Sequence, residues 1–234
     1  MLRFVLLLGL LGLPAAAGAA QDTFTSGARP VALVELFTSE GCSSCPPAEQ
    51  WLAARRSDPT LWQAFVPVSW HVDYWNGLGW RDAYSRPEFT ARQYAYAAAW
   101  HDGSVYTPCF VRNGREWHPG NPADGNAASP GVLTIRYDGR VARGSFAGAS
   151  GAWELHVVLL GGEIRSRVTA GENAGSTLAH EFVALAAASG PLDRDLALPR
   201  QTLSGVSRYA LAAWVTRRGS PDPVQATGGW LAAN

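Results

Sequence analysis

The motif Cys42-Ser43-Ser44-Cys45-Pro46-Pro47 constrains this chain more than any other feature, because it closely follows an apolar, β-rich run over residues 31–37. Two thiols three positions apart at a strand-to-helix turn can close a small disulfide ring. The N-terminus of a helix favours the thiolate form of a nearby cysteine. Two prolines cost little there, because the N–H groups of a first helical turn have no partner inside the helix. The motif predicts a strand–turn–helix unit in which Cys42 is the better nucleophile.

A C-x-x-C pair in this setting has three chemical interpretations. The thiols can exchange electrons with another disulfide, form an inert structural disulfide, or provide half of a metal site. A structural zinc site usually needs four protein ligands, and the chain has three cysteines without a second C-x-x-C pair. We favour redox exchange and keep the other two as alternatives.

The first twenty residues have the pattern of a secretory signal peptide. Arg3 supplies the positive charge, residues 4–13 form an apolar core, and Ala17-Gly18-Ala19 is a small-residue cleavage site. We therefore expect a secreted or periplasmic protein in an oxidising compartment, where disulfides persist. An uncleaved N-terminal anchor is the alternative, and it is the only membrane attachment that the sequence suggests, since no later segment is long and apolar enough to span a bilayer.

Composition supports a globular protein without a nucleic-acid partner. Hydrophobic residues make up 47% of the 234 residues and charged residues 16%, which is enough for a real core. The 19 basic residues balance 19 acidic ones, so there is no electrostatic footprint for nucleic acid or an anionic membrane. No phosphate loop or Ser-His-Asp order stands out, and His101, His118, His156 and His180 lack ligand spacing. We expect no cofactor, because a dithiol carries two electrons by itself.

The sequence pattern of the first half of the chain predicts alternating strands and helices. In order, the expected elements are a strand at 31–37, a helix at 43–56, a strand at 65–72, a helix at 85–100, a strand at 109–111 and a returning strand at 116–118. Ser85 and Glu88 form an S-x-x-E capping box that marks the start of the second helix. Asn113-Gly114 is a strong hairpin signal.

The sequence pattern of the second half of the chain predicts a different architecture. Residues 119–131 are rich in Pro, Gly, Asn and Ala and are typical of a linker. Short strands are then expected at 132–137, 141–146, 153–160, 163–169, 178–186 and 209–216, a spacing typical of an antiparallel sandwich. Residues 178–188 also fit a helix, because they are rich in alanine. The expected organisation is a signal peptide (1–20), an α/β domain (21–118), a linker (119–131) and a β-rich, antiparallel sandwich-like domain (132–234).

The order of elements in residues 21–118 resembles thioredoxin. The matching residues are the Cys42/Cys45 pair, Thr107-Pro108 and the turn at 111–114, and Glu35 stands where thioredoxin has a buried acid in the strand before the cysteines. Two features depart from that pattern. The linker replaces the final helix, and Cys109 follows the Thr-Pro pair at a position where a polar, non-thiol residue is expected.

Longer motifs are similar to the secreted bacterial family called domain of unknown function 1223. They are Glu35-Leu36-Phe37-Thr38-Ser39 with Gly-Cys-Ser-Ser-Cys-Pro-Pro, Trp70-His71-Val72-Asp73-Tyr74-Trp75, Gly79-Trp80, Val105-Tyr106-Thr107-Pro108 and Gly171-Glu172-Asn173. These motifs span most of the chain after residue 20. The family name leaves the reaction open, so the resemblance implies a fold and a site rather than an activity.

The thioredoxin resemblance implies a role for each matched residue. Cys42 attacks a disulfide as thiolate, and Cys45 resolves the mixed disulfide. Pro108 is expected in the cis form facing the cysteines, which leaves the Thr107 backbone free to pair with an extended substrate. Glu35, if buried, accepts the proton of Cys45, because burial raises a carboxyl pKa; alternatively it is a solvent-facing acid.

Other candidates lie in the aromatic segment after the second strand. His71 and Asp73 alternate, so we expect them on one face near the cysteines. His71 can stabilise a thiolate or bind a metal, or it can prop the tryptophan-rich loop. Trp75, with Trp70, Tyr74 and Trp80, can line a peptide cleft, although we favour packing for this set.

Cys109 separates two functional hypotheses. As a small apolar residue it needs no role, but beside the cysteine pair it would complete a copper or zinc site of Cys42, Cys45, Cys109 and His71. We expect a thiol-disulfide oxidoreductase acting on protein disulfides or dithiols. The alternatives are this soft-metal site and a non-catalytic binding module with a structural disulfide.

Overall fold

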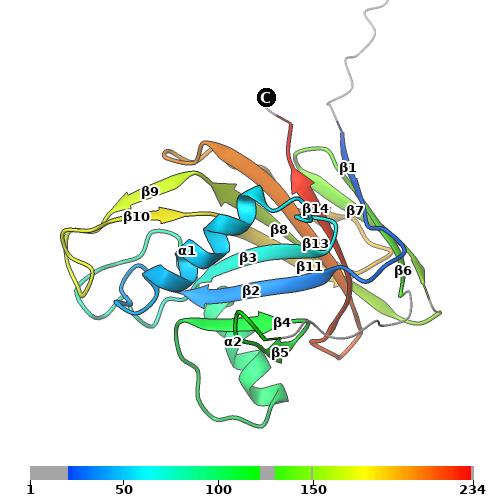
Figure 1. The fold of residues 1–234 in the computed structure, drawn as a ribbon. Coiled ribbons are helices and arrows are strands. Elements are labelled where there is room, and N and C mark those ends of the chain that lie inside the picture. Colours follow the sequence, from blue (N-terminus) through cyan, green and yellow to red (C-terminus); the bar gives the residue numbers. More distant parts are fainter. Residues whose placement is uncertain (1–20, 122–129, 149, 233–234) are drawn as a thin grey trace, which may run out of the picture.

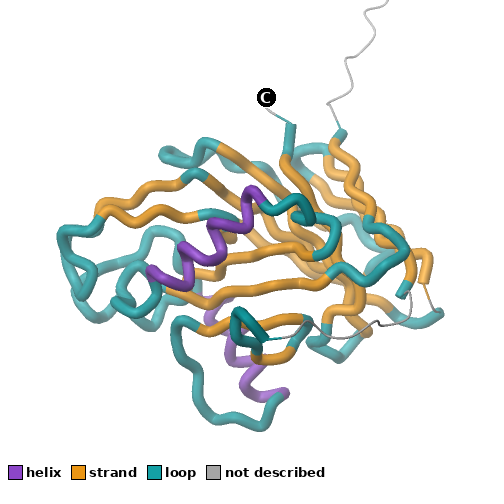
Figure 2. Tube along the Cα trace, viewed as in Figure 1, coloured by secondary structure: helices purple, strands orange, loops and turns teal. Residues whose placement is uncertain are grey.

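The computed structural model describes residues 21–121, 130–148 and 150–232. The expected signal peptide and residues 122–129 of the expected linker lie outside the described residues. Within them the protein is a β-rich α/β structure with mixed sheets and few helices (Figure 2).

The main sheet combines strands from both halves of the chain, in the order β14-β13-β8-β11-β3-β2-β4-β5 (Figure 1). The strands are β2 (Ala32–Thr38), β3 (Phe65–His71), β4 (Cys109–Arg112), β5 (Arg115–Glu116), β8 (Trp153–Gly162), β11 (Val183–Pro191), β13 (Arg208–Arg217) and β14 (Pro223–Trp230). The two halves meet where β11 runs parallel to β3, with Val183 opposite Ser69. The sheet is therefore continuous across the expected domain boundary.

Strand β2 lies inside this sheet and every one of its residues is buried. It pairs in parallel with β3 and antiparallel with β4. A strand covered on both faces needs a continuous apolar sequence, which is why residues 31–37 lack polar alternation. The end of β2 leads directly to the C-x-x-C turn.

A second sheet packs on the main one and completes a sandwich. It contains β1 (Asp22–Thr25), β6 (Gly131–Tyr137), β7 (Val141–Gly148) and β12 (Leu196–Ala197), in the order β1-β6-β7-β12. Leu133 and Ile135 of β6 share a buried core with Leu155 of β8 and Leu211 of β13. A separate two-stranded ribbon of β9 (Ile164–Arg167) and β10 (Thr177–His180) lies against the first helix.

Two helices cover opposite faces of β2. Helix α1 (Pro46–Ala54) continues into a 3-10 turn, η1 (Arg55–Ser57), and α2 (Pro87–Ala99) follows β3. Phe37 contacts Tyr96 of α2, whereas the next residue, Thr38, donates a hydrogen bond to Glu49 of α1. Successive residues of a strand point to opposite faces, so the two helices lie on different sides of the sheet.

Several local predictions are confirmed and one is wrong. Asn113 and Gly114 both have positive φ and join β4 to β5, as a tight hairpin requires. Residues 178–188 form strands rather than a helix, and strands β6 to β14 meet the expectation of a β-rich second half.

The predicted capping box of Ser85 and Glu88 is wrong, because α2 is preceded by Arg86 without a side-chain cap. The Ser85 hydroxyl donates instead to the Asp82 carbonyl.

Candidate functional site

Cys42 and Cys45 form a disulfide immediately before α1, with an S–S distance of 2.12 Å and 5.4 Å between their Cα atoms. Cys45 is the residue preceding the helix, and Pro46 and Pro47 occupy its first turn. Both cysteines are fully buried, whereas Ser43 and Ser44 between them are exposed. In the disulfide form the two cysteines are therefore equally buried.

The loop over residues 171–173 holds the segment that carries Cys42. The Asn173 side-chain amide donates to the carbonyls of Glu40 and Cys42, at 2.9 and 3.0 Å. The Glu172 carboxylate accepts hydrogen bonds from the Ser43 backbone N–H and hydroxyl, at 3.1 and 2.6 Å. These bonds lower the pKa of Glu172. The Gly171-Glu172-Asn173 motif, which had no assigned role in the sequence, thus fixes the C-x-x-C turn.

Trp75 links the cysteine turn to Thr107. Its indole N–H donates to the Thr107 hydroxyl at 2.8 Å. Its Cβ lies so close to Gly41 that a side chain there would approach it to 3.1 Å. The Thr107–Pro108 peptide bond is cis, and both residues are partly buried. Trp75 thus contacts the residue that precedes Cys42 with its Cβ and Thr107 with its indole nitrogen.

Glu35 lies on the other face of β2. Its carboxylate accepts hydrogen bonds from Trp70 Nε1 at 2.8 Å and the Tyr96 hydroxyl at 2.6 Å, and it forms a 2.6 Å ion pair with Arg92. Tyr96 and Arg92 belong to α2, whereas the cysteines precede α1. The structure therefore does not bring Glu35 to Cys45, and the burial of Glu35 excludes the alternative of a solvent-facing acid.

Cys109 also faces away from the cysteine pair. It pairs across the sheet with Phe37, whose side chain contacts α2, whereas its neighbour Phe110 contacts Trp51 of α1. Burial is the main cause that raises the pKa of the Cys109 thiol to about 11. The described residues therefore do not assemble the alternative metal site of three cysteines and His71.

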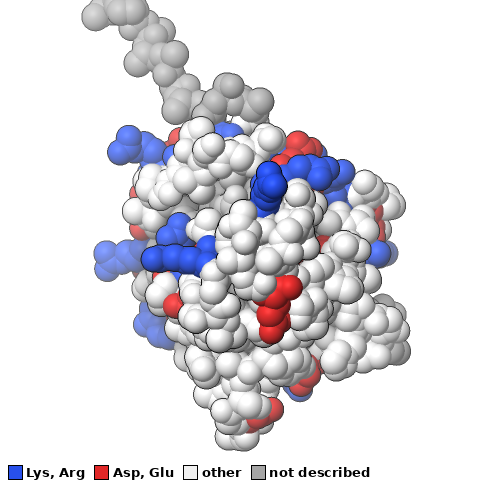
Figure 3. All heavy atoms as spheres, turned by 90° about the vertical axis from the view of Figure 1, so that its left-hand side faces the viewer, with Lys and Arg blue, Asp and Glu red and all other residues white. Residues whose placement is uncertain are grey.

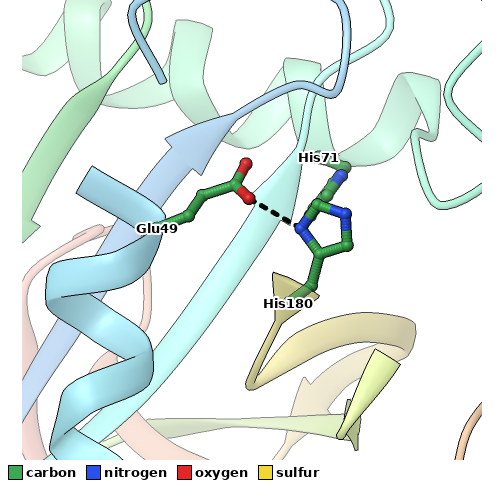
Figure 4. Close-up of side chains that lie close together, drawn as sticks. All are labelled: Glu49, His71 and His180. Atoms are coloured by element: carbon green, nitrogen blue, oxygen red, sulfur yellow. Dashed lines mark hydrogen bonds and ion pairs between the residues drawn. The ribbon is translucent and has the colours of Figure 1, made fainter. Parts of the chain in front are cut away.

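His71 belongs instead to a buried cluster of acids and histidines on the α1 side of the sheet (Figure 4). His180 Nδ1 lies 2.6 Å from Glu49 Oε2, and His180 Nε2 lies 3.2 Å from Glu40 Oε1. His71 Nδ1 lies 2.7 Å from Asp82 Oδ2. The cluster adjoins the C-x-x-C turn, because the Glu49 N–H donates to the Cys45 carbonyl.

The charges of this cluster stabilise one another. Burial alone lowers the pKa of His180, but hydrogen bonds to Glu40 and Glu49 outweigh it and raise that pKa to about 10. Burial likewise opposes the charge of Glu49, yet His180 holds the Glu49 pKa below its usual value. The Asp82 carboxylate overcomes burial to raise the pKa of His71. The arrangement keeps ionised groups inside the protein because each has a partner of opposite charge.

Sequence reasoning missed His180 and Glu49. His180 lies on β10, more than one hundred residues beyond α1, and only the tertiary fold brings it there. Asp73 does not join His71 as expected, because it accepts a hydrogen bond from Thr90 of α2. Trp80 does reach the cluster, and its indole N–H donates to Glu40 at 2.7 Å.

One face of the molecule carries charges of both signs. On the face shown in Figure 3, basic and acidic side chains are interspersed among uncharged residues. Among the described residues, no helix is long and apolar enough to cross a membrane.

Comparisons with known proteins identify relatives of this chain. The model of the family described as "Protein of unknown function (DUF1223)" matches residues 33–216. A crystal structure of protein AGR_C_4864 from Agrobacterium tumefaciens is similar with a TM-score of 0.60 and 25% identity, covering 88% of this chain and 96% of that one. HBP35 of Porphyromonas gingivalis has a similar fold, with a TM-score of 0.53 and 13% identity over 87% of this chain and 76% of that one. No curated protein matches the chain significantly.

Proposed function

We propose that this chain, which belongs to the DUF1223 family, is a secreted or periplasmic thiol-disulfide oxidoreductase that acts on protein thiols through Cys42 and Cys45. The observation that carries the proposal is the disulfide between these residues at the N-terminus of α1. A helix N-terminus stabilises the thiolate that is released when such a disulfide is opened.

The arrangement of the neighbouring strands supports a thioredoxin-like unit within the larger sheet. Strands β3, β2, β4 and β5 are adjacent in that order, with β2 parallel to β3 and antiparallel to β4. Helix α1 connects β2 to β3, and α2 lies between β3 and β4. Thioredoxin arranges a strand–helix–strand–helix–hairpin sequence in this way, with its cysteines at the first helix.

The reaction transfers two electrons without another group. A substrate thiolate attacks Cys42 Sγ, the Cys42–Cys45 bond breaks, and a mixed disulfide forms while Cys45 leaves as a thiolate and takes a proton. A second substrate thiolate then attacks the substrate sulfur of the mixed disulfide and releases Cys42 as a thiolate. The substrate gains a disulfide and the protein becomes a dithiol; the reverse sequence reduces a substrate disulfide.

The burial of both sulfurs favours a second candidate, a structural disulfide in a non-catalytic binding module. Exchange requires Cys42 Sγ to become accessible, which in our proposal happens when the 171–173 loop releases Ser43 and the Cys42 carbonyl. A structural disulfide needs no such opening. The two candidates therefore differ in whether the folded protein can be reduced.

The experiment measures reduction and turnover of the folded protein. The protein is equilibrated with glutathione buffers of graded potential, and free thiols are counted by mass spectrometry. The reduced protein is then mixed with a peptide containing one disulfide. We expect two additional thiols in reducing buffers, and peptide reduction that is lost in Cys42→Ser but retained in Cys109→Ser, the matched control. A disulfide that stays intact at all these potentials, or turnover unchanged in Cys42→Ser, would refute the proposal.

A further inference from the structure

Three buried donor groups from different elements converge beside the disulfide. One ring nitrogen each of His71 and His180 and one carboxylate oxygen of Glu49 lie within 4.8 Å of one another. They come from β3, β10 and α1, and all three residues are buried. Figure 4 shows the two imidazole rings and the carboxylate gathered between these elements.

Each group is held by an outer partner through its other polar atom. Asp82 holds His71 through Nδ1 at 2.7 Å. Glu40 lies 3.2 Å from His180 Nε2, and Thr38 donates to Glu49 Oε1 at 2.6 Å. Of the atoms turned away from these outer partners, His71 Nε2 has no hydrogen bond within the described residues, and His180 Nδ1 and Glu49 Oε2 are bonded to each other at 2.6 Å. The contacts of His71 with Asp82 and of Glu49 with Thr38 are hydrogen bonds, and that of His180 with Glu40 is an ion pair. Metal-binding histidines and carboxylates are typically oriented by outer polar partners of this kind.

His71 Nε2 is the independent observation that points to a ligand. This atom is buried, and none of the described residues gives it a hydrogen-bond partner. A buried polar atom without a partner costs free energy and is uncommon in native proteins. Because Asp82 accepts the proton on Nδ1, a metal ion that displaces the second proton of the His71 ring binds at Nε2, since a metal-bound imidazole is neutral.

We propose that His71 Nε2, His180 Nδ1 and Glu49 Oε2 bind a single divalent transition-metal ion, with zinc as the best fit. Two imidazoles and one carboxylate suit zinc and its neighbours better than calcium or magnesium, which prefer oxygen ligands. The ion replaces the 2.6 Å hydrogen bond between His180 Nδ1 and Glu49 Oε2. Three protein ligands leave a fourth position for an external ligand.

The charge of the surroundings favours such an ion. Glu40, Glu49 and Asp82 place three carboxylates in the buried cluster, against two imidazoles. The two positive charges of the ion offset this excess. The site uses no cysteine, so the inference stands apart from the thiol chemistry proposed above.

The test uses the full chain, stripped with a chelator and then titrated with zinc by calorimetry. We expect one ion per chain and a higher unfolding temperature with zinc. X-ray absorption of the zinc-loaded wild type should show nitrogen and oxygen ligands at about 2.0–2.2 Å and no sulfur at about 2.3 Å. His71→Gln should weaken binding at least about tenfold, and Asp82→Asn, which affects only the outer partner, by about tenfold or more.

Two controls make the result specific. His156→Gln changes a histidine outside the cluster and should bind zinc like the wild type. A Cys42→Ser/Cys45→Ser double variant should also retain binding, which separates this inference from the thiol proposal. Absence of stoichiometric zinc uptake by the wild type, a sulfur ligand in the absorption spectrum, or equal affinity in a folded His71→Gln variant would overturn the proposal. The wild-type spectrum decides the question even if a variant does not fold.

Discussion

Glu35 and Arg92 form an ion pair in which Arg92 neutralises the charge of the buried Glu35 carboxylate. The Glu35 carboxylate is fully buried and contacts Arg92, Trp70 and Tyr96. The guanidinium also lies over the rings of Trp70, Tyr96 and Trp214. Burial opposes the charge of Arg92, but the Glu35 carboxylate outweighs it and raises the Arg92 pKa. These contacts connect β2 to α2 rather than to the cysteines.

Replacing Arg92 with Met should therefore destabilise the protein strongly. The substitution leaves the Glu35 carboxylate buried without its counter-charge, which costs about 3 kcal/mol or more. Urea unfolding monitored by circular dichroism would measure the loss. Arg165→Met on the exposed side of β9 is the matched control and should change the free energy of unfolding by less than about 0.5 kcal/mol. Equal stability of the two variants would contradict the assigned role.

Cys109 should be the least reactive thiol of the reduced protein. Only the thiolate reacts quickly with alkylating reagents, and a pKa of about 11 leaves little thiolate near neutral pH. We expect Cys42 to be alkylated first, as the position of its sulfur before the helix predicts. Mass-spectrometric mapping with limiting reagent gives the order. Early labelling of Cys109 would make the third thiol the functional one.

At the scale of elements, the 171–173 loop controls the N-terminus of α1. Glu172 binds Ser43 from a loop that follows β9, so a residue far along the chain restrains the disulfide turn. Glu172→Ala removes both hydrogen bonds while leaving Asn173 in place. We expect faster reduction of the disulfide by dithiothreitol, because the turn opens more often.

The rate of thiol release under limiting dithiothreitol measures this effect. Glu88→Ala, an exposed glutamate at the start of α2, is the control for loss of one surface charge and should reduce at the wild-type rate. A Glu172→Ala rate equal to that of the control would show that the loop does not restrain the disulfide.

At the scale of the whole molecule, the main sheet makes the two halves dependent on each other. Strand β3 is almost completely buried and pairs with both β2 and β11. A fragment of residues 21–118 would expose one edge of β3 and the apolar face that packs against Trp214 and Ala212. We expect this fragment to remain unfolded or to aggregate, whereas residues 21–234 fold. Sharp, dispersed amide resonances from the fragment would contradict this expectation.

Global stability should fall in mild acid because of His156. Burial, together with Arg92, lowers the pKa of His156 to about 3. In the unfolded chain His156 therefore binds a proton near pH 6.5, whereas in the folded protein it stays neutral until about pH 3. The free energy of unfolding declines as the pH falls from about 6.5 toward 3. We expect His156→Gln to reduce the loss between about pH 7 and pH 4 by about 2 kcal/mol, allowing for partial exposure of the ring. Urea unfolding of both proteins at the two pH values tests this; equal losses would contradict it.

Local sequence patterns account for the short-range features of this protein. The apolar run before C-x-x-C, the Asn113-Gly114 turn and the short strands of the second half depend on neighbouring residues, and local preferences were enough to predict them. The family was also recognisable, because its motifs are continuous stretches of sequence.

The way these pieces combine depends on long-range packing. It placed Glu35 and Cys109 on the α2 face, where neither meets the disulfide, and it brought His180 from β10 to Glu49 on α1. It also joined both halves of the chain in one sheet through β11 and β3. The face on which a residue lies depends on strand register, and contacts across more than one hundred residues depend on sheet order. Neither is encoded in local sequence, because both arise from the way the whole chain buries its apolar surface.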